Sequence, residues 1–108
     1  MDEQEFKTRA EQALEDLNRR LAPAAEEHEF EVDFNAGALA IEFETPPAKF
    51  VVSPNSPVSQ IWVSAHSKSF KLDWDQARAA FVLTGTGQTL VELMGDAVGQ
   101  QLGEKVTL

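Results

Sequence analysis

Two segments near the start of the chain alternate between apolar and polar residues, and this alternation restricts the possible folds more than any other feature. Residues 29–34 read EFEVDF and residues 39–44 read LAIEFE. Successive side chains of a β-strand point to opposite faces, so each segment predicts a strand with one apolar and one polar face. Asn35-Ala36-Gly37 lies between them and predicts a short turn with a glycine. The two segments predict a hairpin in an antiparallel sheet that is covered on one side only.

More strand-like segments follow the hairpin. They are Lys49–Val52, Gln60–Ala65, Phe70–Trp74 and Ala80–Thr84. Pro46-Pro47 interrupts the pattern before them, and residues 53–57, with two prolines, are expected to form a loop. The chain therefore predicts a continuous run of strands in its middle.

Amphipathic helices are predicted on both sides of these strands. Apolar residues recur at spacings of three and four at Phe6, Ala10, Ala13, Leu14, Leu17 and Leu21. This spacing predicts a helix from about Asp2 to Leu21, which Pro23 is expected to end. Thr89 followed by Glu92 is typical of a capping box and predicts the start of a second helix, which ends near Gly103.

The order of helix, strands and helix indicates an α+β fold. We expect one domain, residues 1–108, in which the N- and C-terminal helices pack on one face of an antiparallel sheet of about five to six strands. No run of 18 apolar residues is present, so no membrane span is expected. The acidic N-terminus does not resemble a secretion signal or a transit peptide, and a monomer in the cytoplasm is the simplest expectation.

Charge and cysteine content limit the possible partners and cofactors. The net charge is −9, and phosphate backbones repel such a surface, so metal cations and basic proteins are better candidates than nucleic acid. The absence of cysteine excludes disulfides, thiolate metal sites and cysteine nucleophiles. No Gly-x-Ser-x-Gly, phosphate loop, His-x-x-x-His or Glu-x-x-His motif is present, so no catalytic residues are predicted.

Most of the negative charge lies in the first third of the chain. Residues 1–33 contain 11 acidic and 4 basic side chains, a net charge of −7. The candidate metal ligands there are Glu11, Glu15, Glu26, Glu27, Glu29, Glu31 and Asp33. Side chains on the same side of a strand lie roughly 6.8 Å apart at Cα, so two of them reach one ion only by bending together. Weak, exposed sites for hard ions such as iron, manganese, magnesium or calcium are expected, with His28 as one further candidate ligand.

Simpler interpretations of these residues remain open at this stage. The carboxylates could form a solvated sheet face that keeps the protein soluble, and His28 could be a solvated loop residue. Trp62 alternates with Ile61 and Val63, so it points away from the helices if those two residues are in the core. It would then be a partner anchor on an uncovered face, together with Gln60 and Ser64. A partly covered surface aromatic or a reversed strand register is the alternative.

The segment FVVSPNSPVSQIWVSAHSKSFKLDWD resembles the central signature of the frataxin family, through Gln60-Ile61-Trp62 and the pair Asp73-Trp74. EFKTRAEQALEDLNRRL, VDFNAGALAIEFE and GQTLVELMGDAVGQQLGEKV also match the family in order, so the resemblance covers nearly the whole chain and is greatest to bacterial frataxins. It differs from the usual pattern at Ser53 and Pro54, and at Asn18-Arg19, where acidic residues are common.

The resemblance implies a function as well as a fold. It implies a helix–sheet–helix sandwich whose acidic first helix and first strand bind iron weakly, with residues 26–33 in an acidic ridge. The sheet surface around Trp62 and Gln60 would dock on the cysteine desulfurase–scaffold complex of iron–sulfur cluster assembly. We therefore expect a non-enzymatic regulator or iron donor. A ferroxidase that stores iron and an acidic adaptor that binds no metal are the alternatives.

Overall fold

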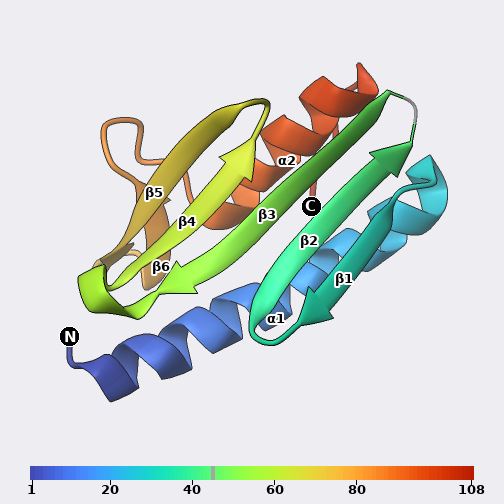
Figure 1. The fold of residues 1–108 in the computed structure, drawn as a ribbon. Helices are drawn as coiled ribbons and strands as arrows, with labels where there is room; N and C mark the ends of the chain where they lie inside the picture. Colours follow the sequence, from blue (N-terminus) through green and yellow to red (C-terminus); the bar gives the residue numbers. More distant parts are fainter. Residues whose placement is uncertain (45) are drawn as a thin grey trace.

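The computed structural model describes residues 1–44 and 46–108, and it confirms the predicted fold class (Figure 1). The elements are α1 (Glu3–His28), β1 (Glu31–Asn35), β2 (Ala38–Glu44), β3 (Pro47–Asn55), the 3-10 turn η1 (Ser56–Val58), β4 (Gln60–Ala65), β5 (Lys68–Asp75), β6 (Ala80–Leu83) and α2 (Leu90–Leu102). The strands form one six-stranded sheet in chain order, and every neighbouring pair is antiparallel. Both helices lie against the same face of this sheet (Figure 1). We call the other face the open face.

The first helix is longer than predicted, and the expectation that Pro23 ends it is wrong. The helix begins where the Asp2 side chain accepts a hydrogen bond from the Glu5 N–H at 2.7 Å, and it continues through Pro23 to His28. A proline inside a helix removes one hydrogen bond, here the bond to the Arg19 carbonyl. Pro23 is exposed, so water can bond to that carbonyl, and residues 24–27 are good helix formers. Within the described residues, no helix is long and apolar enough to cross a membrane.

The extension of α1 changes the place of Glu29. Glu29 adopts the left-handed conformation with φ of 56° and caps the helix, and its N–H donates to the Ala25 carbonyl. The strand that follows starts only at Glu31, so the prediction of a strand from Glu29 is wrong at that end. Glu29 therefore does not share a strand face with Glu31 and Asp33.

Residues 53–55 also differ from the prediction, because they belong to β3 rather than to a loop. Proline is tolerated in a strand where no neighbour needs its N–H. The pairing of β3 with β2 ends at Val52, opposite Leu39, so Pro54 lies beyond the end of that ladder. Pro47 is the first residue of β3, where proline is also tolerated. β4 has the predicted bounds, and β5 and β6 differ from theirs by one or two residues.

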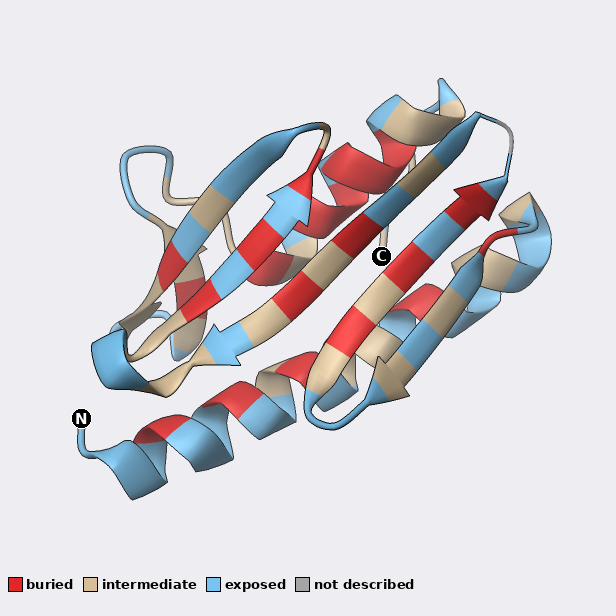
Figure 2. Cartoon of the chain, in the orientation of Figure 1, coloured by how far each residue is buried: buried red, intermediate tan, exposed pale blue. Residues whose placement is uncertain are grey.

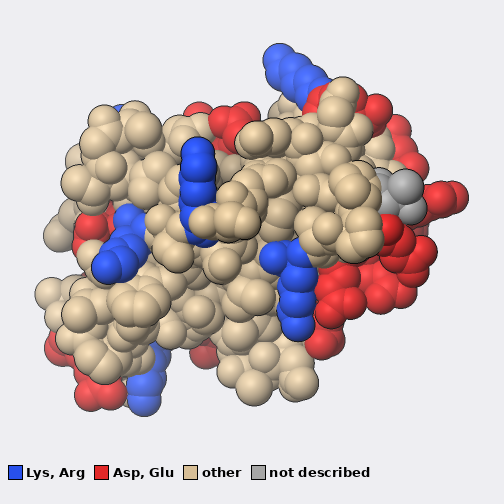
Figure 3. Space-filling model, turned by 45° about the horizontal axis from the view of Figure 1, so that its top comes forward, with Lys and Arg blue, Asp and Glu red and all other residues tan. Residues whose placement is uncertain are grey.

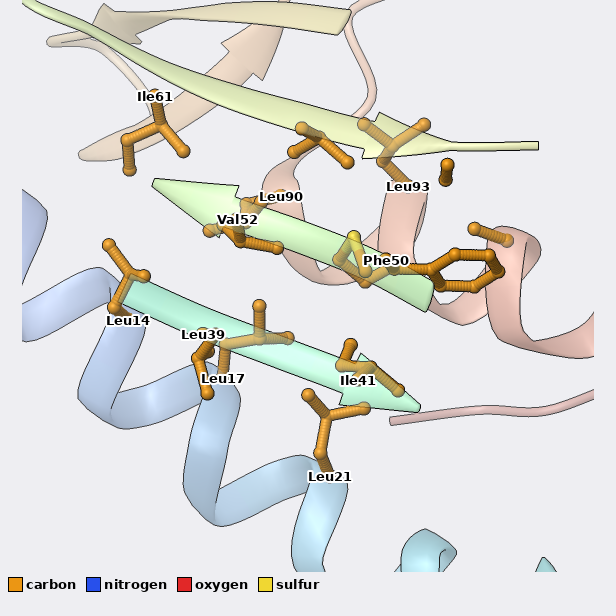
Figure 4. Packing of buried hydrophobic residues seen from close by; sticks show 14 of the residues in the cluster. Leu14, Leu17, Leu21, Leu39, Ile41, Phe50, Val52, Ile61, Leu90 and Leu93 are labelled. Atoms are coloured by element: carbon orange, nitrogen blue, oxygen red, sulfur yellow. The ribbon is translucent and has the colours of Figure 1, made fainter. Parts of the chain in front are cut away.

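The core lies between the sheet and the two helices. Buried residues alternate along the strands and form stripes on the inner faces of the helices (Figure 2). In the close view, Leu14, Leu17 and Leu21 of α1 face the Leu39 and Ile41 side of the sheet (Figure 4). Among the described residues, no polar or charged residue is buried. The polar side chains of the alternating strands therefore lie outside the core.

The C-terminal tail, Glu104–Leu108, folds back over α2. Thr89 and Glu92 form the predicted capping box, and Gly103 ends the helix with φ of 74°. The tail crosses α2 at Gly95 and Gly99, where a Cβ atom on Gly99 would lie 2.7 Å from the Glu104 carbonyl oxygen. Two of its side chains, Val106 and Leu108, pack against the core.

Candidate functional site

Trp62 lies on the open face, as the alternation in β4 predicts. Ile61 and Val63 are fully or almost fully buried, whereas Trp62 is 39% exposed. The reversed register is therefore excluded. Gln60 and Ser64 lie on the same side of β4 as Trp62, so the three predicted partner-binding residues share one face.

Neighbouring strands hold the indole ring of Trp62 in place. Lys71 of β5 lies directly opposite Trp62, and its Nζ is 5.1 Å from the centre of the ring. This distance is typical of a cation–π contact. The indole Nε1–H donates to the Gln60 Oε1 at 3.0 Å. The ring is thus both exposed and held in one orientation.

The hydrogen bonds continue from Gln60 to two further residues. The Gln60 Nε2 donates to Asp73 Oδ1 at 3.1 Å, and the Thr84 Oγ1 donates to Asp73 Oδ2 at 2.9 Å. Gln60 and Asp73 are directly opposed on β4 and β5, and Thr84 follows β6. Sequence reasoning did not identify Lys71, Asp73 or Thr84 as site residues.

A hollow of about 370 Å³ lies beside Trp62 on the open face. Its lining is Val51, Ser53, Trp62, Val63, Ser64, Ser69, Phe70 and Lys71. Most of the side chains that reach it from the open face are small, so the ring stands above its surroundings. Such a raised aromatic beside a shallow hollow suits contact with another protein.

A group of acidic side chains gathers at one end of the molecule (Figure 3). In Figure 3, Asp and Glu atoms crowd the right-hand end, whereas the middle of the visible face is mostly uncharged with separate Lys and Arg side chains. Glu26 and Glu27 are exposed in the last turn of α1, Glu29 caps that helix, and Glu31 and Asp33 are exposed on β1. The fold thus brings five of the predicted metal ligands to one region.

Glu11 and Glu15 do not join this group. Both are exposed on α1, one turn apart. A helix rises about 1.5 Å per residue, so Glu15 lies roughly 16 Å along the axis from Glu26. Asp16 lies beside them, and the hydrogen bond from the Arg20 side chain lowers the pKa of its carboxyl, with Arg19 adding to the effect.

Glu42 is an acidic neighbour that sequence reasoning left out of the site. It lies directly opposite Glu31 across β1 and β2, so the two carboxylates project from the same face. Lys49 lies opposite Glu42 on the other side, with 3.7 Å between its Nζ and Glu42 Oε1. The pairing of Glu31 with Glu42 could have been predicted from the hairpin, because residues equally distant from its turn lie opposite each other.

The acidic side chains of α1, β1 and β2 in this region are exposed. Among residues 1–44 and 46–108, no group of three or more His, Asp and Glu side chains is arranged to hold a metal ion. The exposed pair Glu31 and Glu42 can approach a hard cation from one side only. His28 ends α1 instead of lying in a loop, and its Nδ1 is 2.9 Å from Glu104 Oε1 in the tail. His28 thus connects the helix end to the tail.

Comparisons with known proteins agree with this architecture. A family model described as a frataxin-like domain matches residues 1–104. The iron–sulfur cluster assembly protein CyaY of Dechloromonas aromatica is 34% identical over an alignment that covers 100% of this chain and 99% of that protein. The iron–sulfur cluster assembly protein CyaY of Azotobacter vinelandii is 28% identical and is covered, like this chain, over 86% of its length.

A solved structure shares the fold. It is a frataxin from Psychromonas ingrahamii, described as a model for stability modulation within the CyaY family, and it superposes with a TM-score of 0.75. Its sequence is 21% identical, and the superposition covers 99% of this chain and 97% of that one. On the strength of the family match over 1–104 and the full-length relative, the chain belongs to the frataxin-like family.

Proposed function

We propose that the protein is an iron-binding regulator or iron donor in iron–sulfur cluster assembly, and that it acts by docking on the cysteine desulfurase–scaffold complex. The observation that carries the proposal is the exposed Trp62 on the open face, with carboxylates at one end of the same face. Relatives of similar length are named as iron–sulfur cluster assembly proteins, which supports the pathway.

The two parts of the surface have different roles in this proposal. Trp62 is the apolar anchor at the centre of the contact, where buried aromatic side chains contribute most of the binding energy. The acidic end steers the protein toward a basic partner surface, because exposed charges act over long distances. Iron is the cargo, held weakly by exposed carboxylates, and no residue is assigned a catalytic role.

The experiment compares variants by their kinetics on surface-immobilised cysteine desulfurase at two salt concentrations. Trp62→Ala should weaken binding by about 2 kcal/mol or more, mainly through faster dissociation. Neutralising Glu29 and Glu31 together should instead slow association and reduce its salt dependence. Val58→Ala is the matched control, since Val58 is also an exposed apolar residue, at 52%, but lies in η1.

The outcomes separate the proposal from its alternatives. Unchanged dissociation in Trp62→Ala, with the fold intact by thermal melting, would remove the docking site. Aerobic oxidation of Fe²⁺ with turnover would favour a ferroxidase. A titration with Fe²⁺ that leaves every backbone amide signal unshifted would favour an adaptor that binds no metal.

A further inference from the structure

The hydrogen bonds around Trp62 can run in only one direction. The indole N–H only donates, and a carboxylate such as that of Asp73 only accepts. The Gln60 amide lies between them, with Oε1 at 3.0 Å from the indole nitrogen and Nε2 at 3.1 Å from Asp73 Oδ1. If this amide were reversed, its oxygen would face a carboxylate and its NH₂ group would face an N–H. Asp73 therefore sets the orientation of Gln60, and Gln60 sets the acceptor for Trp62.

Asp73 is itself fixed from a third element. Its second oxygen, Oδ2, accepts the hydrogen bond from Thr84 Oγ1 at 2.9 Å. Asp73 is half-buried, and the chain of contacts joins β4, β5 and the turn after β6. Both carboxylate oxygens of Asp73 thus accept hydrogen bonds from side chains of the protein, namely those of Gln60 and Thr84.

We infer that Asp73, acting through Gln60, is a positioning residue that turns the Trp62 N–H toward the protein and presents the ring to the partner. This inference rests on the proposed docking function. Because its N–H is used internally, Trp62 contacts a partner through the ring. The hydrogen-bond donors left in this patch are the Lys71 ammonium group, the second Nε2–H of Gln60 and the hydroxyl groups of Ser53, Ser64 and Ser69.

This set of groups defines the chemistry of the partner segment. An apolar ring flanked by donors suits an extended segment that places an apolar side chain on the ring. The same segment would offer backbone carbonyl or carboxylate oxygens to Lys71 and Gln60. The partner would thus offer hydrogen-bond acceptors near Trp62 and basic side chains opposite the acidic end of this protein. These two different contacts fix the orientation in which the partner binds to the open face.

The indole N–H signal of Trp62 tests the positioning in the free protein. In ¹⁵N-labelled protein the two tryptophans give two indole signals, and Trp62→Phe identifies the one from Trp62. Asp73→Asn should shift this proton signal upfield and speed its exchange with solvent several-fold. Thr84→Val, which removes only the second contact to Asp73, should act in the same direction but less.

Two more variants make the test decisive. Gln60→Met removes the acceptor and should give the largest change, whereas Glu42→Gln is the control that removes a negative charge elsewhere on the open face. If Gln60→Met moves the Trp62 signal and neither Asp73→Asn nor Asp73→Leu, which leaves no acceptor for Gln60, moves it, Asp73 has no positioning role. If neither variant moves it, the hydrogen-bond chain does not form in solution and the inference fails.

Docking kinetics then separate the inference from the proposed function. Asp73→Asn should speed dissociation from the desulfurase by a smaller factor than Trp62→Ala does. If Trp62→Ala leaves docking unchanged, the proposed function fails while the indole result stands. If Trp62→Ala weakens docking and Asp73→Asn moves the indole signal without changing dissociation, positioning by Asp73 has no role in docking.

Discussion

A methyl group added at Gly99 tests whether the C-terminal tail is packed on α2. In an open helix interior, alanine is more favourable than glycine by about 1 kcal/mol. Here the new Cβ would lie 2.7 Å from the Glu104 carbonyl oxygen and 3.3 Å from the Val106 nitrogen. Both are backbone atoms, so no flexible side chain can move aside. Gly99→Ala should therefore destabilise the protein despite the better helix propensity.

The size of the effect follows from the two ways in which the structure can respond. Forcing an extra methyl group into a packed site costs typically about 1–3 kcal/mol. Alternatively the tail lifts away, which exposes the half-buried Val106 and Leu108 at a cost of about 1 kcal/mol each. The cheaper response limits the cost to about 2 kcal/mol at most. After the gain of about 1 kcal/mol in helix propensity, a net loss of up to about 1 kcal/mol remains, or up to about 4 °C in Tm.

The assay is thermal and urea unfolding of four proteins: the full chain and a chain shortened after Gly103, each with and without the Gly99→Ala substitution. In the full chain the substitution lowers Tm. In the shortened chain it should raise stability by about 1 kcal/mol, because only helix propensity remains. Gln100→Ala, on an exposed position of the same helix, is the control and should have little effect in either background. A rise in Tm of the full-length Gly99→Ala protein would show that the tail does not pack on Gly99.

Two further predictions concern the charged residues. Replacing Glu29, Glu31 and Asp33 with their amides should weaken Fe²⁺ binding in an NMR titration. The fold should stay intact or become more stable, because repulsion between like charges is relieved. Neutralising the acids in the first turn of α1 is the control, and unchanged affinity in the triple variant would exclude the three residues as ligands. Asp16→Asn should cost about 0.5 kcal/mol or less at neutral pH, since the side chain is 38% exposed. Its pKa is lowered by Arg20, so the contribution is present above the ordinary pKa of aspartate and is lost as pH falls through the lowered value; unfolding curves of both proteins should converge in acid, and a difference that persists there would contradict this origin.

The helices and strands could be predicted from the sequence, because an element with one buried face has apolar residues at regular spacings along the chain. The face of Trp62 was predicted on the condition that Ile61 and Val63 lie in the core, and the burial of both residues confirms it. The ends of elements were harder, because they depend on which backbone groups lack partners. Pro23 did not end α1, because it removes only one backbone hydrogen bond at an exposed position. Pro54 is tolerated in β3, because it lies beyond the residues of β3 that pair with β2.

The contacts of Asp73 could not be predicted, because they depend on a hairpin without the usual turn residues. Two-residue hairpin turns with positive φ favour glycine and asparagine. Here the turn is His66-Ser67, with φ of 53° and 61°. His66 Nε2 donates to the Ala97 carbonyl of α2 at 2.9 Å, so a tertiary contact supports the turn. Only this register places Gln60 opposite Asp73.

The order of the strands also has a consequence for how the chain folds. Each strand pairs with the next one in sequence, so the sheet can form as successive hairpins with short loops, which favours rapid folding. The two helices that cover the sheet stand at opposite ends of the chain, and α2 follows the last strand. During synthesis the apolar face of the sheet therefore stays partly uncovered until residues 90–102 have left the ribosome, and this interval is when the nascent protein is most exposed to aggregation.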